Sequence, residues 1–155
     1  MIDENDVPSH WDVKRIGDVC ADANLGGTPT RSNENYWGGD IPWISSGQVR
    51  GKYTTDSPDE SITQKGLDES STQVWPKGTV LVAMHGKGTI GRSALAGIDT
   101  AGNQSICGLI VDDGVMGNEF LYYWLQSIED ALAYKGRGAT ASRQNLNQAI
   151  ILDTK

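Results

Sequence analysis

Apolar residues are arranged along the chain in two patterns, continuous runs and helical spacing, and these patterns predict its regular elements. Continuous apolar runs at residues 79–84 and 105–111 are typical of buried β-strands. Between residues 118 and 135 the apolar positions follow helical spacing at Leu121, Leu125, Ile128 and Leu132. Asn118 is suited to cap this segment and Gly136 to end it, so one long amphipathic helix is predicted over about 118–135.

Glycine divides the rest of the chain into short pieces. Nineteen glycines predict many turns between short strands, and residues 26–37 form a polar loop. Short helical turns are expected at 61–66 and 144–149. Since only one helix is long enough for a crossover, the predicted fold class is α+β, with a mixed, mostly antiparallel twisted sheet, one long helix and long polar loops. Phe120 and Trp124, which widen the apolar stripe of that helix, are expected to be core residues, as is Trp11.

Length and cysteine content place the chain among small intracellular domains. Its 155 residues form one domain, without an internal repeat or a linker. Cys20 and Cys107 form no C-x-x-C pair, which indicates a reducing compartment rather than a disulfide framework or a zinc site. No apolar run approaches the roughly 18 residues of a membrane span, so we expect a cytoplasmic protein without membrane contact.

The charge is unevenly distributed. A net charge of −7 argues against indiscriminate binding to nucleic acid, yet phosphate is met by a local surface rather than by the total charge. Residues 1–12 and 56–69 are acidic. Residues 85–92 and 135–143 carry lysine and arginine without any acid, so they are candidate anion-binding segments.

Motifs for catalysis are scarce. Gly86 to Gly91 satisfies G-x-G-x-x-G, but glycine interrupts the following residues, so no helix is expected where a dinucleotide site needs one. Neither a Walker motif, a G-x-S-x-G elbow nor H-E-x-x-H occurs, and His10 and His85 are the only histidines. Paired carboxylates for glycoside chemistry stay open, because fourteen aspartates can meet in many ways. We therefore expect a binding role with no cofactor and no metal.

Several short motifs follow one another in order over about residues 10–149: Trp11, residues 14–19, Gly26-Gly27-Thr28-Pro29, Tyr36-Trp37, Ile41 to Gly47, Ile62-Thr63, Gly66-Leu67, Ser70-Ser71, Pro76 to Val80, Gly86 to Gly91, and Asn103-Gln104. This ordered set resembles one family, the target recognition domain of type I restriction-modification specificity subunits.

The resemblance implies a non-catalytic domain that binds double-stranded DNA and reads one half of a bipartite site. It also implies partners: a methyltransferase (M) subunit and, through the complex, a nuclease and translocase (R) subunit. In the family, two recognition domains are separated by long helices. This chain is expected to be one such domain over 1–155, a fragment that lacks the following spacer helix.

Residue type selects a predicted contact set from the polar loops. Arginine, lysine, asparagine and glutamine are the side chains that bind base edges and phosphates. The base readers are predicted to be Asn33, Gln48, Arg50 and Arg143, and the phosphate contacts Arg31, Lys87, Arg92, Arg137 and Gln144. These turns are expected to converge on one side of the domain, with the carboxylates elsewhere.

Three alternatives stay open at this point. Polar glycine-rich loops are also what ordinary solvated turns look like, and composition alone favours that interpretation. A nucleotide-binding enzyme would use Gly86 to Gly91. A carbohydrate-binding or protein-binding module would use Trp37, Trp43 and Trp75 as stacking platforms.

Overall fold

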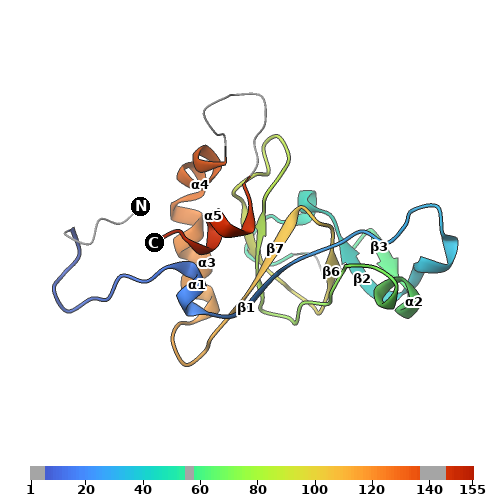
Figure 1. Cartoon of the computed structure of the whole chain (residues 1–155), viewed down its shortest axis with the longest axis horizontal. Coiled ribbons are helices and arrows are strands. Elements are labelled where there is room, and N and C mark those ends of the chain that lie inside the picture. The colour runs from blue at the N-terminus through green and yellow to red at the C-terminus, as the bar shows by residue number, and fades with distance from the viewer. Residues whose placement is uncertain (1–5, 55–57, 137–145) are drawn as a thin grey trace.

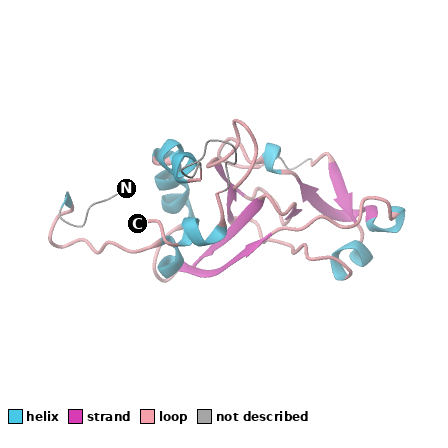
Figure 2. Ribbon diagram, turned by 45° about the horizontal axis from the view of Figure 1, so that its top comes forward, coloured by secondary structure: helices cyan, strands magenta, loops and turns pink. Residues whose placement is uncertain are grey.

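The computed structural model describes residues 6–54, 58–136 and 146–155. It has two β-sheets side by side, with most of the helices on one flank (Figures 1 and 2). The predicted α+β class is confirmed, since four of the five strand pairs among the described residues are antiparallel and one is parallel. The strands divide between two sheets rather than forming one.

The first sheet has four antiparallel strands in the order β1-β7-β4-β5. Its centre is formed by β4 (Val80–Ala83) and β7 (Ile106–Val111), which are the two apolar runs that the sequence predicts. All of β4 and most of β7 are buried, as expected for strands covered on both faces. The edges are β1 (Cys20–Leu25) and β5 (Ser93–Leu95).

The second sheet has three strands in the order β3-β2-β6. Its central strand β2 (Trp37–Ile44) pairs antiparallel with β3 (Glu60–Ile62) and parallel with β6 (Ala101–Gly102). A short 3₁₀ helix, η2 (Glu34–Tyr36), precedes β2, and another, η3 (Ser46–Gln48), follows it. Helix α2 (Gln64–Asp68) begins after Thr63, whose hydroxyl accepts from the Gly66 amide as a predicted cap should.

Four helices cover one face of the four-stranded sheet: α1 (Ile16–Val19), α3 (Asn118–Ser127), α4 (Glu129–Lys135) and α5 (Gln148–Leu152). The main core lies beneath them and includes Leu121, Leu125 and Leu132, as the helical spacing predicts. A second cluster on the opposite face surrounds Trp75, and a third around Trp43 belongs to the three-stranded sheet.

The single long helix predicted over 118–135 is two helices with a break at Ile128. The hydroxyl of Ser127 donates to the Trp124 carbonyl at 2.6 Å, which is the acceptor that the Ile128 amide would use in a continuous helix. The Ile128 amide bonds to Leu125 instead. The predicted cap is also displaced by one residue, because Gly117 is the N-cap and Asn118 is the first helical residue.

Both cysteines are free, in agreement with the sequence. Burial raises the pKa of the Cys20 thiol to about 11 and that of Cys107 to about 12. Both thiols are therefore protonated at neutral pH, so neither is an activated nucleophile.

Close contacts between glycine backbone and the Trp75 indole join the two sheets. Trp75 is fully buried, and its indole nitrogen donates to Asn24 in β1. A Cβ added at Gly108 in β7 would lie 2.3 Å from the indole nitrogen, and one at Gly102 in β6 would lie 2.8 Å from the ring. Residues with a side chain do not fit at these positions, so glycine is required for the indole to contact both sheets.

We predict that Gly108→Ala destabilises the domain by about 2 kcal/mol, because the added methyl group overlaps a buried, immobile ring. Urea unfolding followed by circular dichroism measures the change. Gly47→Ala is the matched control, since Gly47 is exposed and its added Cβ meets nothing closer than 3.7 Å. Equal unfolding midpoints for Gly108→Ala and the wild type would contradict the close packing described here.

Candidate nucleic-acid interface

Three polar turns meet at one end of the four-stranded sheet. The turn Asn103–Ser105 leads into β7, and the Ser105 carbonyl accepts from the amide of Met84, where β4 ends and the 85–91 turn begins. The Asn103 amide donates to the carbonyl of Ile44, after which η3 follows. The ends of β2, β4 and β6 therefore bring the 45–48, 85–91 and 103–105 turns together, along the upper side of Figure 1.

The 85–91 turn is a tight hairpin connection rather than a phosphate cradle. The carbonyl of Gly86 accepts from the amides of Thr89 and Ile90, and the Gly91 amide donates to Ala83. A strand, β5, follows where a dinucleotide site needs a helix. The amides of Thr89, Ile90 and Gly91 are thus bonded within the turn, and the missing helix does not favour a nucleotide cradle at Gly86 to Gly91.

Lys87 stands at the tip of this turn and is exposed, and no ion pair of Lys87 is found among the described residues. Arg92 immediately precedes the return strand β5, and its guanidinium lies 3.9 Å from the Glu129 carboxylate of α4, a loose and partly solvated pair. Both side chains can therefore turn toward a phosphate with little loss of free energy, because neither has to break a strong ion pair. Arg50 is exposed after buried Val49.

Two glutamines at this end of the sheet have their amide oxygens held. In Gln48 the amide oxygen accepts from the Ser45 backbone amide at 3.3 Å. In Gln104 it accepts from the Thr28 hydroxyl at 2.6 Å, and the side chain is exposed. Gln104 was not among the predicted contacts, although it lies in a recognised motif. The motif drew attention to this position, but residue type alone did not select Gln104 as a contact.

Arg31 and Asn33 lie beside the three-stranded sheet instead. The Arg31 guanidinium stacks over Trp37 at 4.0 Å and over Trp43 at 4.9 Å, and it forms a bidentate ion pair with Glu60. The hydrogen bonds to Glu60 raise the pKa of Arg31. Asn33 caps η2 by accepting from the Asn35 amide. Both side chains therefore have local structural roles, and Arg31 faces a carboxylate.

Arg137, Arg143 and Gln144 lie outside the described residues. The flanking residues are described: a Cβ on Gly136 would lie 2.8 Å from the Leu146 amide nitrogen and 3.1 Å from the Ile90 side chain. The chain therefore leaves and re-enters the described structure beside the 85–91 turn.

The expected convergence on one side is thus correct for part of the set. The segments of Gln48 and Lys87 share one end of the sheet, whereas Arg31 is held at a separate place by Glu60. The carboxylates are partly segregated, because exposed Asp112 and Asp113 follow β7 at the opposite end of the sheet. The prediction took no account of contacts between loops. It therefore could not show which cation pairs with a carboxylate far away in the sequence.

Lys52 is a further cation near the domain surface that sequence reasoning did not select. Its ammonium lies 3.1 Å from Glu119 and near the rings of Tyr53 and Tyr123. The hydrogen bond to Glu119, and to a smaller extent the one to Tyr123, raises the pKa of Lys52 to about 12. This lysine ties the 50–54 segment to α3.

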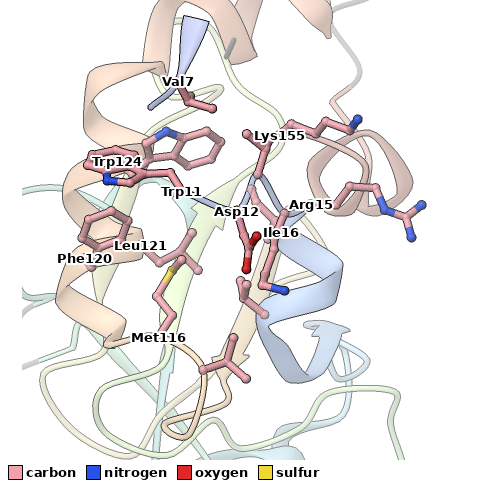
Figure 3. A pocket seen from close by; sticks show the side chains of 14 residues that line it. Val7, Trp11, Asp12, Arg15, Ile16, Met116, Phe120, Leu121, Trp124 and Lys155 are labelled. Carbon is pink, nitrogen blue, oxygen red and sulfur yellow. The ribbon is translucent and has the colours of Figure 1, made fainter. Parts of the chain in front are cut away.

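An apolar pocket of about 300 Å³ lies at the helical flank, between the N-terminal segment, α1 and α3 (Figure 3). Trp11, Phe120 and Trp124 line it. Trp11 and Phe120 are 61% and 60% exposed, so the prediction that they are core residues is wrong. Both line the pocket that remains between α3 and the N-terminal segment, so solvent reaches their rings (Figure 3).

The described residues contain no group of three histidine, cysteine, aspartate or glutamate side chains able to hold a metal ion. Within the same ranges, no helix combines the length and apolar character needed to cross a bilayer.

Comparison with known sequences identifies relatives along most of the chain. A family model described as Type I restriction modification DNA specificity domain matches residues 8–155. The MjaIX specificity subunit of Methanocaldococcus jannaschii, a type I restriction enzyme, is 40% identical over 119 residues, which cover 76% of this chain. The HindI specificity subunit of Haemophilus influenzae is 27% identical over 143 residues, or 91% of this chain. The chain spans only 27% and 30% of the length of these two relatives.

Solved structures share the fold. The HsdS subunit from Thermoanaerobacter tengcongensis matches 90% of this chain and 33% of its own, with a TM-score of 0.66 at 22% identity. A chain from a study of complex assembly and conformational transition in the type I R-M system matches 96% of this chain and 34% of its own, with a TM-score of 0.72 at 20% identity.

We predict that Arg31→Ala lowers the free energy of unfolding by about 1 kcal/mol, because it removes a cation–π stack and a partly exposed ion pair. Denaturant unfolding followed by tryptophan fluorescence measures the change, since Trp37 and Trp43 report on this contact. The control Arg50→Ala should stay within about 0.5 kcal/mol of the wild type. A neutral Arg31→Ala would remove the structural role assigned to this side chain.

Proposed function

The chain belongs to the type I restriction modification DNA specificity domain family, and from that premise we propose that it is a non-catalytic recognition domain that binds double-stranded DNA and reads one half of a bipartite site. One observation carries the proposal: three polar turns from two different sheets are fixed side by side by backbone hydrogen bonds at one end of the domain. A rigid scaffold that presents several polar turns together suits the reading of a groove.

The turns supply the two kinds of group that DNA recognition needs. Lys87, exposed at the hairpin tip, is suited to neutralise a phosphate, and Arg92 follows it immediately before β5. Gln48 offers amide hydrogens toward base edges. Arg50, Arg137, Arg143 and Gln144 remain proposed contacts on residue type, whereas Arg31 and Asn33 are proposed only after release from their present partners.

Partners and location follow from the family. We propose that the whole protein directs a methyltransferase subunit and, through it, a nuclease and translocase subunit to the DNA site. The chain would then be a single recognition domain, acting in the cytoplasm where the DNA lies. The short share of each relative that it spans agrees with one recognition domain of a longer subunit.

Neither of the two alternative ligand classes from the sequence is favoured. The nucleotide-binding interpretation lacks the helix that a phosphate site needs, because the 85–91 turn leads into strand β5. The carbohydrate-binding reading requires exposed indoles, yet Trp75 is fully buried, Trp43 is 2% exposed, and the Arg31 guanidinium lies over Trp37.

We predict that affinity for duplex DNA falls steeply as salt rises, and that Lys87→Ala lowers the slope of log Kd against log salt by about one unit, the value for one lost phosphate contact. Fluorescence anisotropy with a labelled duplex between low and physiological salt measures both quantities. At physiological salt a lone duplex should bind at about micromolar Kd or more weakly, because the domain is acidic overall and its footprint is short.

Lys65→Ala is the matched control, since Lys65 is an exposed lysine on α2, away from the three turns. It should leave the slope unchanged. Salt-independent binding, or an equal loss for both lysine variants, would rule out the proposed interface.

A further inference from the structure

We infer that the apolar pocket between the N-terminal segment, α1 and α3 is a docking site for a partner protein, which places in it the apolar face of a helix that also carries lysine or arginine. The inference goes beyond the proposed DNA-binding function, because the pocket lies on the helical flank and none of the three polar turns lines it.

Helix α3 has two apolar faces, and only one of them is fully covered. Leu121 and Leu125 are buried in the main core. Phe120 and Trp124 line the pocket instead, four residues apart and therefore one above the other on the helix, and Met116, before the helix N-cap, also lines it. This apolar row extends over more than one helical turn, as in grooves that receive amphipathic helices.

The N-terminal segment forms the opposite wall of the pocket, chiefly through Trp11. Figure 3 shows the rings of Trp11, Phe120 and Trp124 close to one another. The pocket, at about 300 Å³, is at the small end of the range for ligand sites, so it suits one or two apolar side chains better than a large molecule. Exposed aromatic side chains gathered in this way are typical of the residues that dominate binding between proteins.

Carboxylates surround this pocket. Asp12 lines it, and Asp112 and Asp113 are exposed in the turn that leads to α3. The amides of Val115 and Met116, two residues of the pocket wall, donate to the Asp112 carbonyl, so this acidic turn adjoins the pocket directly. The domain as a whole carries a net charge of −7.

Cations of the pocket wall do not reverse this charge. Lys14, Arg15 and Lys155 line the pocket as well, but the Arg15 guanidinium lies 3.1 Å from Asp18 and 3.6 Å from Asp153. In Figure 3 the Arg15 guanidinium points away from the aromatic rings. The three other aspartates outnumber the two lysines, so a partner with lysine or arginine beside its apolar side chains is attracted and an acidic partner is repelled.

Three designed peptides and the 155-residue chain test the inference. Two are labelled amphipathic helices of about 18 residues, long enough to form a helix, with leucine on one face and either lysine or glutamate on the other. The third has the composition of the lysine peptide with its leucines scattered around the helix. Fluorescence anisotropy at physiological salt measures their binding to the wild type, Phe120→Ala, Trp11→Ala and the control Tyr134→Ala, whose ring is 75% exposed on α4 outside the pocket.

We expect the amphipathic lysine peptide to bind more tightly than the other two. Phe120→Ala and Trp11→Ala should each weaken its binding about tenfold, because each removes an aromatic contact, and Tyr134→Ala should leave it unchanged. Binding of duplex DNA should be the same in all four proteins, so failure of this inference and failure of the proposed function are separate results.

Equal binding of the lysine and glutamate peptides would overturn the inference, as would unchanged binding in both pocket variants or no binding at about 1 mM peptide. Sedimentation equilibrium tests another occupant: a wild-type dimer that Phe120→Ala dissociates would assign the pocket to a second copy of the chain and exclude the partner proposed here. Thermal unfolding monitored by circular dichroism confirms that the variants are folded, as expected for side chains that are more than half exposed.

Discussion

The packing of glycine backbone against a single indole is the constraint on which the two-sheet arrangement depends. Trp75 contacts Gly108 of the four-stranded sheet and Gly102 of the three-stranded sheet, and its indole nitrogen is satisfied by Asn24. Because both sheets meet the same ring, the indole limits how closely they can approach. Backbone hydrogen bonds at the ends of β2, β4 and β6 then hold the polar turns together beside this joint.

The sequence predicts elements whose cause is local or whose burial is complete. The runs that became β4 and β7 are apolar along nearly their whole length, and the Thr63 cap depends on residues three positions apart. Elements set by distant partners were not predicted. The segment Cys20–Leu25 contains alanine, aspartate and asparagine, which disfavour strands, yet it is a strand because it pairs with β7. The break at Ile128 depends on one side-chain hydrogen bond of Ser127, which helical periodicity does not reveal.

The site shows the same division. Residue type selected Lys87 and Gln48, which stand on two of the three neighbouring turns and stay proposed contacts. It also identified Arg31, whose charge is engaged by Glu60 from 29 positions away, a pairing that requires β2 and β3 to be aligned. Gln104 was not selected from residue type, and its amide oxygen is held by Thr28, 76 positions earlier. Candidate chemistry is thus legible in the sequence, while the partner that restrains or directs each group is not.

The glycine joint separates two kinds of sequence change. Positions that contact the indole or a neighbouring carbonyl accept no additional atom, whereas Gln48, Lys87 and Gln104 project from turns that the joint supports from behind. Related domains can therefore change the side chains on these turns without changing how the two sheets pack. The binding surface of this molecule is free to evolve because the glycine positions behind it are fixed.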